Sequence, residues 1–376
     1  MIVLIFLLLG LVFGSLPDAQ YQFKWFIFAL ISAWILGRGA VAKRFGLAAG
    51  ALFAYVLTSA AYVWIYRENR YLSVPPYDQM ALRYFAADSV AKLMLVLTPF
   101  LLCNVSKKDY RLAGEVMAAM YCLLSSLFVV GQFIFTSDHC LGEHSCGGAM
   151  MNPSMNAGMI VCTLPFVWSQ FYGRWRYIVS TLAIVAVLLS KSAVGAGLMA
   201  AFLVLWINSF WLGAAAGLTA MVGGYMVQGM ELFNSSDRVL IWKHMMGNWV
   251  NNVWNIPFGM GYGTYYVFGS SLQVHDNLRA TMWWPWMHND WLQGIFELGI
   301  VGFLLMVATY ATAVHRARKE KACLVSLVLY GIFMSMDYPL HLSISCFFGA
   351  WLTTACLLQS GSSENYGGLK CSKVKK

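Results

Sequence analysis

The sequence predicts an all-α, polytopic integral membrane protein with about twelve transmembrane helices. Composition carries this prediction: 60% of the 376 residues are hydrophobic and only 11% are charged. A soluble domain carries about 25% charged residues, so little of this chain is expected to fold in water. At roughly 20 residues per span, the length allows about a dozen helices and few long loops.

The apolar runs give the order of the predicted helices. We expect spans near residues 1–17, 21–37, 45–66, 86–104, 113–135, 153–172, 177–190, 192–208, 209–228, 291–314, 322–337 and 339–359. The first run lacks the basic start and the small-residue cleavage site of a signal peptide, so it is predicted to be a span. The spans form one domain, residues 1–359, and the polar tail, 360–376, is predicted to be disordered.

The placement of basic residues predicts the orientation, because Lys and Arg mark cytoplasmic loops. With the N-terminus inside, the even-numbered connections and the tail hold most of the 25 Lys and Arg residues. Both termini are then cytoplasmic, and the long connection at about 229–290 lies outside. The net charge of +9 is therefore concentrated in the predicted cytoplasmic loops. It therefore indicates a membrane-lipid environment and does not predict a nucleic-acid partner.

Two of the nine cysteines lie together in a predicted outer loop. Cys140 and Cys146 would form a local disulfide if that side of the membrane is oxidising. The adjacent His139 and His144 leave a metal site as the alternative, although the spacing matches no standard zinc pattern.

Basic residues on the predicted outer side depart from the general charge distribution. They could pair with nearby carboxylates, or they could together bind an anion, since Arg and Lys bind phosphate oxygens. Lys191 lies between two serines at the mouth of two apolar helices, where an ionisable side chain is costly and often functional. Snorkelling to the membrane surface is its alternative explanation. The outer basic residues are Arg67, Arg70, Arg83, Lys191, Arg238, Lys243 and Arg279.

The long outer connection is predicted to begin with an interfacial helix capped by Ser235 or Ser236. Its apolar stripe at helical spacing favours anchoring in the headgroup layer over a ligand site. Arg238 lies near the helix N-terminus, where an anion is favoured. A glycine-rich loop at 259–263 follows, and a need for positive φ explains it without a nucleotide-binding role. The stripe consists of Val239, Trp242, Met246, Trp249 and Val253.

His288 is the predicted catalytic residue of this region. It follows an aromatic run, residues 283–286, that sets its depth at the membrane interface, and histidine suits proton transfer near neutral pH. A hydrogen-bonded anchor is the simpler alternative. The next span begins with a polar stripe on one face, and its last member should face protein within the membrane. The stripe consists of Asp290, Gln293 and Glu297.

Three motifs in this region together resemble the signature of the O-antigen ligase superfamily. They are Arg238-x-x-x-Trp242, Pro257-Phe-Gly-x-Gly261-x-Gly263 and His288-Asn-x-x-Leu292-x-x-x-x-Glu297-x-Gly299-x-x-Gly302. That superfamily includes lipopolysaccharide O-antigen ligases, related glycan polymerases and oligosaccharyltransferases acting on pilin. The predicted layout, with many spans and one large outer loop, agrees with it.

The resemblance implies an inverting glycosyltransferase of the bacterial inner membrane that works on the periplasmic face with neither metal nor cofactor. Its donor would be a glycan on undecaprenyl pyrophosphate, and its acceptor another glycan or lipid A-core. His288 matches the family's proposed general base, and Arg238 matches the arginine that binds pyrophosphate. Lys191 stands where the family usually has Arg, which keeps the charge but loses the bidentate fork. The other predicted substrate-binding residues are Arg67, Arg70, Arg83, Asn289, Glu297, Gly261 and Gly263.

The acceptor and the reaction class stay open at this level. Ligase, polymerase and protein-targeting enzymes share these motifs. A transporter or flippase of the lipid-linked glycan would also need outer cations and polar residues within the membrane, and it predicts repeats and broken helices. A structural membrane protein, with these residues together by accident, is a further alternative.

Overall fold

The computed structural model describes residues 51–52, 55–56, 59, 107–135, 146–147, 150, 152–207, 242, 245–247, 249–251, 253, 255–262, 265, 287–341 and 343–358. All regular structure among these residues is helical, as the sequence predicts, and they contain no strand. The helices are α6 (Lys107–Phe135), α8 (Pro153–Gln170), α9 (Arg174–Leu189), α10 (Ala193–Ile207), α13 (Asn255–Phe258), α15 (Asp290–Ala317), α16 (Lys321–Met336), the 3-10 helix η5 (Pro339–His341) and α17 (Ser343–Leu357).

The predicted spans from 113 to 208 and from 291 to 359 are helices whose ends lie within a few residues of the predicted ones. The last span differs in its start, because it opens as η5 before continuing as α17. The predicted spans at 1–17, 21–37, 86–104 and 209–228 lie outside the described residues, and the span at 45–66 is described at a few helical positions only.

Two of the described helices are long and apolar enough to cross a membrane, Asp109–Phe135 within α6 and Asp290–Ala317. The core helix of a soluble protein can have the same length and composition, but most of such a helix is buried. Only 33% and 39% of these two apolar stretches are buried. Large exposed apolar surface of this kind marks contact with a membrane or a partner. The described helices therefore indicate membrane association.

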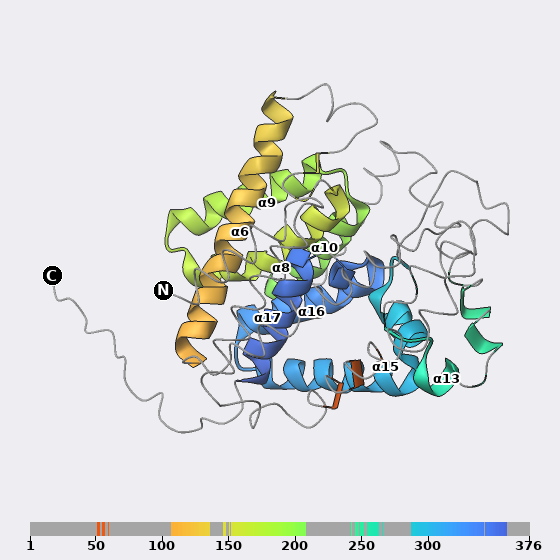
Figure 1. Ribbon diagram of the computed structural model, residues 1–376. Helices are drawn as coiled ribbons and strands as arrows, with labels where there is room; N and C mark the ends of the chain where they lie inside the picture. The colour runs from red at the N-terminus through yellow and green to blue at the C-terminus, as the bar shows by residue number, and fades with distance from the viewer. Residues whose placement is uncertain are drawn as a thin grey trace, which may run out of the picture.

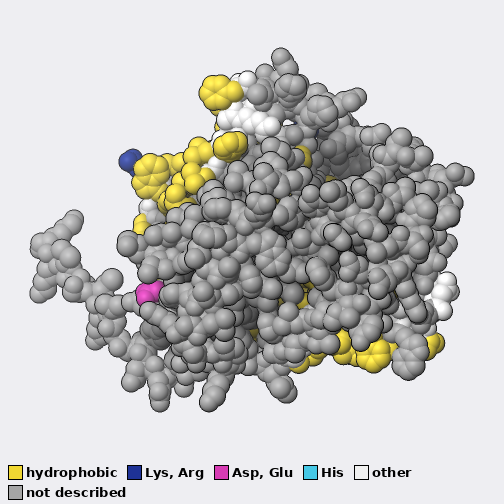
Figure 2. Space-filling model, viewed as in Figure 1, with side chains coloured by type: hydrophobic (Ala, Val, Ile, Leu, Met, Phe, Trp, Pro, Cys, Tyr) yellow, Lys and Arg dark blue, Asp and Glu magenta, His cyan; other side chains and the backbone are white. Residues whose placement is uncertain are grey.

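Most of the exposed large apolar side chains in the described part of the chain lie on three helices, α6, α9 and α15. Figure 2 shows them over the region of α6 and α9 and along the lower edge, where Figure 1 places α13 and α15. The long part of α15 and α6 run in different directions in Figure 1, so both cannot stand perpendicular to one membrane plane. The exposed residues include Leu124, Leu127, Phe128, Tyr177, Ile178, Leu188, Ile300 and Leu304.

Helix α8 is the centre of the bundle. Asn152 caps it, since its side chain accepts a hydrogen bond from the amide of Met155, and Pro153 starts it, where a missing N–H costs nothing. Every residue from Met155 to Val167 is buried. The helix packs against α6, α9, α10 and α16. A helix that is buried on all faces occupies such a central position.

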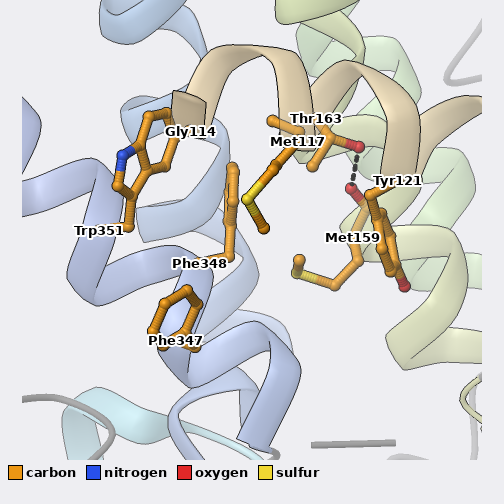
Figure 3. A pocket seen from close by; sticks show the side chains of 9 residues that line it. Gly114, Met117, Tyr121, Met159, Thr163, Phe347, Phe348 and Trp351 are labelled. Carbon is orange, nitrogen blue, oxygen red and sulfur yellow. Dashed lines mark hydrogen bonds between the residues drawn. The ribbon is translucent and has the colours of Figure 1, made fainter. Parts of the chain in front are cut away.

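The interface of α6, α8 and α17 shows how closely these helices approach. Gly114 of α6 faces the indole of Trp351 from α17, and a Cβ at position 114 would lie 1.9 Å from Trp351 Cε2. Figure 3 shows both residues at the edge of a small apolar void of about 20 Å³, with Met117 and Phe348 beside it. The void is about large enough for one water molecule, so the packing here is nearly complete.

Polar contacts define one end of the bundle, called here the Arg111 end. Arg111 near the start of α6 donates two hydrogen bonds, of 2.8 and 2.9 Å, to Glu320, the N-cap residue of α16. These bonds hold the pKa of Glu320 below its usual value. Lys321 donates to the carbonyl of Trp206 at the end of α10. These Arg and Lys residues were predicted to be cytoplasmic, and they lie together at one end, as the charge distribution requires.

The described hydrophobic side chains form two separate clusters. The larger joins α6, α8, α9, α10, α16, α17 and the C-terminal part of α15. The smaller, called here the loop cluster, joins the outer connection to the start of α15 and contains Met245, Trp249, Tyr265, Met287 and Phe296. Helix α15 belongs to both clusters. Its backbone leaves the helical conformation between them, at Gly299.

Candidate functional site

The end of the bundle opposite Arg111 collects the predicted catalytic residue and several polar partners. It is called here the His288 end. The start of α8, the end of α16 and the start of α15 meet there. Two contacts show this: Asn152 donates to Tyr338 at 3.1 Å, and His288 contacts Asp337. Helix α10 starts on the same side, since its Gly197 faces Met336 at the end of α16. Lys191, just before α10, is therefore brought to this end as well.

His288 is held by two residues that follow α16. Its Nδ1 lies 3.0 Å from Oδ1 of Asp337, and the two side chains are 12% and 3% exposed. An ionised carboxylate only accepts, so Nδ1 is the donor in this contact, and in the neutral imidazole with this tautomer Nε2 carries the lone pair. The ring of Tyr338 packs edge-on against the imidazole at 4.7 Å between centroids. A histidine with this tautomer and this orientation can act as a general base.

Two residues at the His288 end have a left-handed backbone conformation that residues other than glycine rarely adopt. His288 and Lys191 have φ of +52° and +51°, and they are the two non-glycine residues with positive φ in the described part of the chain. Such conformations cost of order 1–3 kcal/mol and cluster at functional sites. The sequence predicts both as site residues on chemical grounds alone. Lys191 follows the C-cap Ser190 of α9, where a left-handed residue commonly ends a helix, so it is the conformation of His288 that supports a site here.

The polar start of α15 fixes this helix to its surroundings. Asn289 caps it, accepting from the amide of Leu292 at 3.0 Å and donating to the carbonyl of Ser335 at 3.1 Å. Asp290 accepts from the amide of Leu340 at 2.8 Å. These contacts tie the helix start to the end of α16 and to η5. Asn289 has a structural task, and a role in substrate binding stays a prediction.

Glu297 is buried, as predicted, and faces protein. Its Oε1 accepts from Gln293 at 3.0 Å and from the amide of Tyr265 at 3.3 Å. Burial, and after it the charge of Glu297, raise the pKa of the Tyr265 hydroxyl. Glu297 therefore connects α15 to the outer connection, and its predicted contact with substrate remains to be tested.

The glycine-rich loop lies against the break in α15. The amide of Met260 donates to the carbonyl of Phe296 at 2.9 Å, and the amide of Gly261 donates to that of Glu297 at 2.8 Å. Gly261 has a φ of +108° and is buried. The positive φ predicted for this loop is confirmed.

A cavity of about 190 Å³ lies behind the polar stripe, between α15, α16, α17 and the helical positions at 51–59. Its walls are mostly apolar, and Asp290, Gln293 and Glu297 line one side. Thr309 also lines it, and its buried hydroxyl has no hydrogen-bond partner within the described residues. His288 is not among the described residues that line the cavity.

The predicted interfacial helix is described in part. The described positions between 242 and 250 are helical, in agreement with the prediction. Trp249 is buried in the loop cluster, and the indole of Trp242 donates to the carbonyl of Met287 at 2.6 Å. Val253 is exposed. Three residues of the predicted membrane-anchoring stripe, Trp242, Met246 and Trp249, thus pack in or against the loop cluster.

Several predicted site residues lie outside the described residues: Arg67, Arg70, Arg83, Arg238, Gly263 and Cys140. Cys146 forms a disulfide bond. The other five described cysteines are free, so its partner also lies outside the described residues, and pairing with Cys140 stays a prediction. Among the described residues, no three His, Cys, Asp or Glu side chains gather as metal ligands would.

Sequence reasoning missed the partners of His288. Asp337 lies at the border between two predicted spans, and an ionisable residue between apolar runs was the signal that could have identified it. Tyr338 and Asn152 carry no comparable signal, because their roles depend on which helix ends meet.

Comparison with known proteins adds no assignment. No protein-family model matches the chain, and no curated protein matches it significantly.

Proposed function

We propose that this chain is a polytopic glycosyltransferase of the bacterial inner membrane, of the O-antigen ligase or polymerase type. It transfers a glycan from undecaprenyl pyrophosphate to an acceptor hydroxyl on the periplasmic side. The observation that supports this best is the His288–Asp337 pair, with its 3.0 Å contact at the end of the bundle where Lys191 also lies. The motif resemblance supplies the substrate class.

In the proposed reaction, Nε2 of His288 takes the proton of the acceptor hydroxyl as its oxygen attacks the anomeric carbon. The bond from that carbon to the pyrophosphate oxygen breaks, and undecaprenyl pyrophosphate leaves. Asp337 holds the imidazole and stabilises the imidazolium that forms. Attack opposite the leaving group inverts the configuration. Lys191 and Arg238 stabilise the charge that develops on the pyrophosphate.

The test uses purified protein in liposomes with an undecaprenyl-pyrophosphate glycan, with and without a lipid A-core acceptor and EDTA. We expect transfer that survives EDTA and falls at least 100-fold in His288→Ala, since a general base contributes about 10²–10⁴. Arg238→Ala should lose transfer as well. His315→Ala is the matched control, since His315 is exposed in the last turn of α15, away from the site.

The size of the product then distinguishes a ligase, which adds glycan to the lipid A-core, from a polymerase, which lengthens the glycan. Absence of any new glycosidic bond with an authentic donor would exclude both.

One observation favours a second candidate, a transporter of the lipid-linked glycan. Transporters place broken helices at the membrane midplane, and α15 is broken at Gly299, roughly 13 Å from its start at 1.5 Å per residue. Movement of donor across liposomes without bond formation, unaffected by His288→Ala, would favour this candidate over the enzyme.

A further inference from the structure

Three segments far apart in the sequence meet at the break in α15. Tyr55 and Ser59, four residues apart on one face of a helical segment, contact the backbone of the other two. The hydroxyl of Tyr55 lies 3.0 Å from the carbonyl oxygen of Leu298 and 3.1 Å from that of Phe258. Ser59 Oγ accepts from the amide of Tyr262 at 2.9 Å. We call this junction of Tyr55, Ser59, residues 258–262 and 296–302 the glycine clamp.

The clamp replaces the hydrogen bonds that the break removes. In a continuous helix the carbonyls of residues 296, 297 and 298 would accept from amides four residues later. With Gly299 non-helical, their partners are the amides of Met260 and Gly261 and the hydroxyl of Tyr55. Away from water an unsatisfied backbone group is costly, so each of the three replacements stabilises the broken helix.

Glycine is required where the three segments approach. A Cβ on Gly259 would lie 2.3 Å from the carbonyl oxygen of Glu297, and a Cβ on Gly299 would lie 2.4 Å from that of Pro257. A Cβ on Gly302 would lie 2.9 Å from the ring of Tyr55. These glycines belong to the two motifs that surround the break. In this structure the motifs specify backbone packing.

The clamp holds one end of a short helix whose other end carries His288. Residues 290–298 lie between the His288–Asp337 contact and the break. Phe296 of this half is buried in the loop cluster, and Leu292 and Ile295 pack against that cluster, while Trp291 packs against the larger one. The clamp therefore fixes the outer connection against the same rigid piece that positions the base.

We infer that Tyr55 is a positioning residue: its hydroxyl fixes residues 258–262 relative to His288. In the sequence, the same outer connection contains Arg238. This inference rests on the proposed function, in which Arg238 binds the donor. It assigns a role to the N-terminal part of the chain, where the sequence gives Tyr55 and Ser59 no distinguishing motif.

The test combines hydrogen exchange with transfer kinetics on the full-length protein. Tyr55→Phe removes one hydroxyl and keeps the ring. We expect roughly five-fold faster exchange of the amides of residues 260–262, the effect of losing one net hydrogen bond. We also expect a rise of similar size in the donor KM, with kcat and the acceptor KM within about two-fold. Ser59→Ala should act in the same direction.

Tyr310→Phe is the matched control, because its hydroxyl donates to the carbonyl of Leu327 at 2.8 Å within the bundle. It should alter neither the exchange at 260–262 nor the donor KM. Unchanged exchange in both Tyr55→Phe and Ser59→Ala would overturn the clamp. Faster exchange with an unchanged donor KM would overturn the positioning role. Wild-type protein that makes no glycosidic bond would instead overturn the proposed function, while the exchange data still test the clamp.

Discussion

Replacing Gly299 with alanine tests the glycine clamp most directly. The residue has φ +67° and ψ −173°, a region that is essentially restricted to glycine and costs other residues about 1–3 kcal/mol. A Cβ there would lie 2.4 Å from both the amide nitrogen of Gly259 and the carbonyl oxygen of Pro257. Both are backbone atoms, so no side-chain rotation relieves the contact.

The loop must therefore move away from α15 by roughly 1 Å, which takes its two backbone hydrogen bonds beyond normal length. These are the bonds of 2.9 and 2.8 Å from Met260 and Gly261. Leaving a buried backbone group unpaired costs about 1–3 kcal/mol. Together with the strained backbone, Gly299→Ala should destabilise the protein by about 4 kcal/mol.

The assay is reversible denaturation in mixed micelles, followed by tryptophan fluorescence. Gly131→Ala is the matched control. Gly131 lies within α6, and outside its own helix backbone no described atom lies within 4 Å of a built Cβ, so alanine there should stabilise the helix by up to about 1 kcal/mol. If Gly299→Ala unfolds within about 0.5 kcal/mol of wild type, the clamp argument is refuted. The same holds if both alanine variants lose equal stability.

The remaining predictions concern the two ends of the bundle. Asp337→Asn should lower transfer at least 100-fold with little change in donor KM, because the amide no longer fixes the imidazole tautomer; steady-state kinetics test this, and wild-type kcat would contradict it. At the Arg111 end, the pKa of Glu320 is lowered by Arg111. The stabilisation is present above the usual value of 4.5 and is lost as pH falls below it. Melting temperatures from pH 6 to about pH 3 should therefore fall more for wild type than for Glu320→Gln, and parallel curves would show that the pair contributes nothing.

The helices were largely predictable because their signals are local. Uninterrupted apolar runs predict α6, α9 and α16 by length, and Asn152 and Asn289 cap α8 and α15 where polar residues precede the apolar runs. That Lys191 and His288 lie at the same end of the bundle could also be predicted, since the alternation of helices determines it.

The break in α15 was not predictable from local signals. The sequence favoured one span at 291–314, since a single glycine inside a helix costs only about 1 kcal/mol. At Gly299 the helix is broken because the loop at 259–261 and Tyr55 supply replacement hydrogen bonds. Those partners are distant in sequence. For the same reason, no pattern near His288 could identify Asp337 as its partner.

The central position of α8 has a consequence for biogenesis. The helix is completed at Gln170, but α16, one of its main neighbours, begins only at Lys321. At roughly 5–20 residues per second, the ribosome needs on the order of 10 s to make the intervening chain. Until then one face of α8 lacks its partners. In the folded protein, Phe333 packs against Gly158 on this face, and Ser326 donates to the carbonyl of Cys162.

In the proposed membrane topology, lipid or an insertion factor covers α8 during that interval. Its fully buried polar residues, Asn156 and Thr163, make prolonged contact with lipid costly. Assembly of the bundle is therefore completed by the last helices to be synthesised. A chain that ends before α16 would leave its most buried helix without one of its main partners.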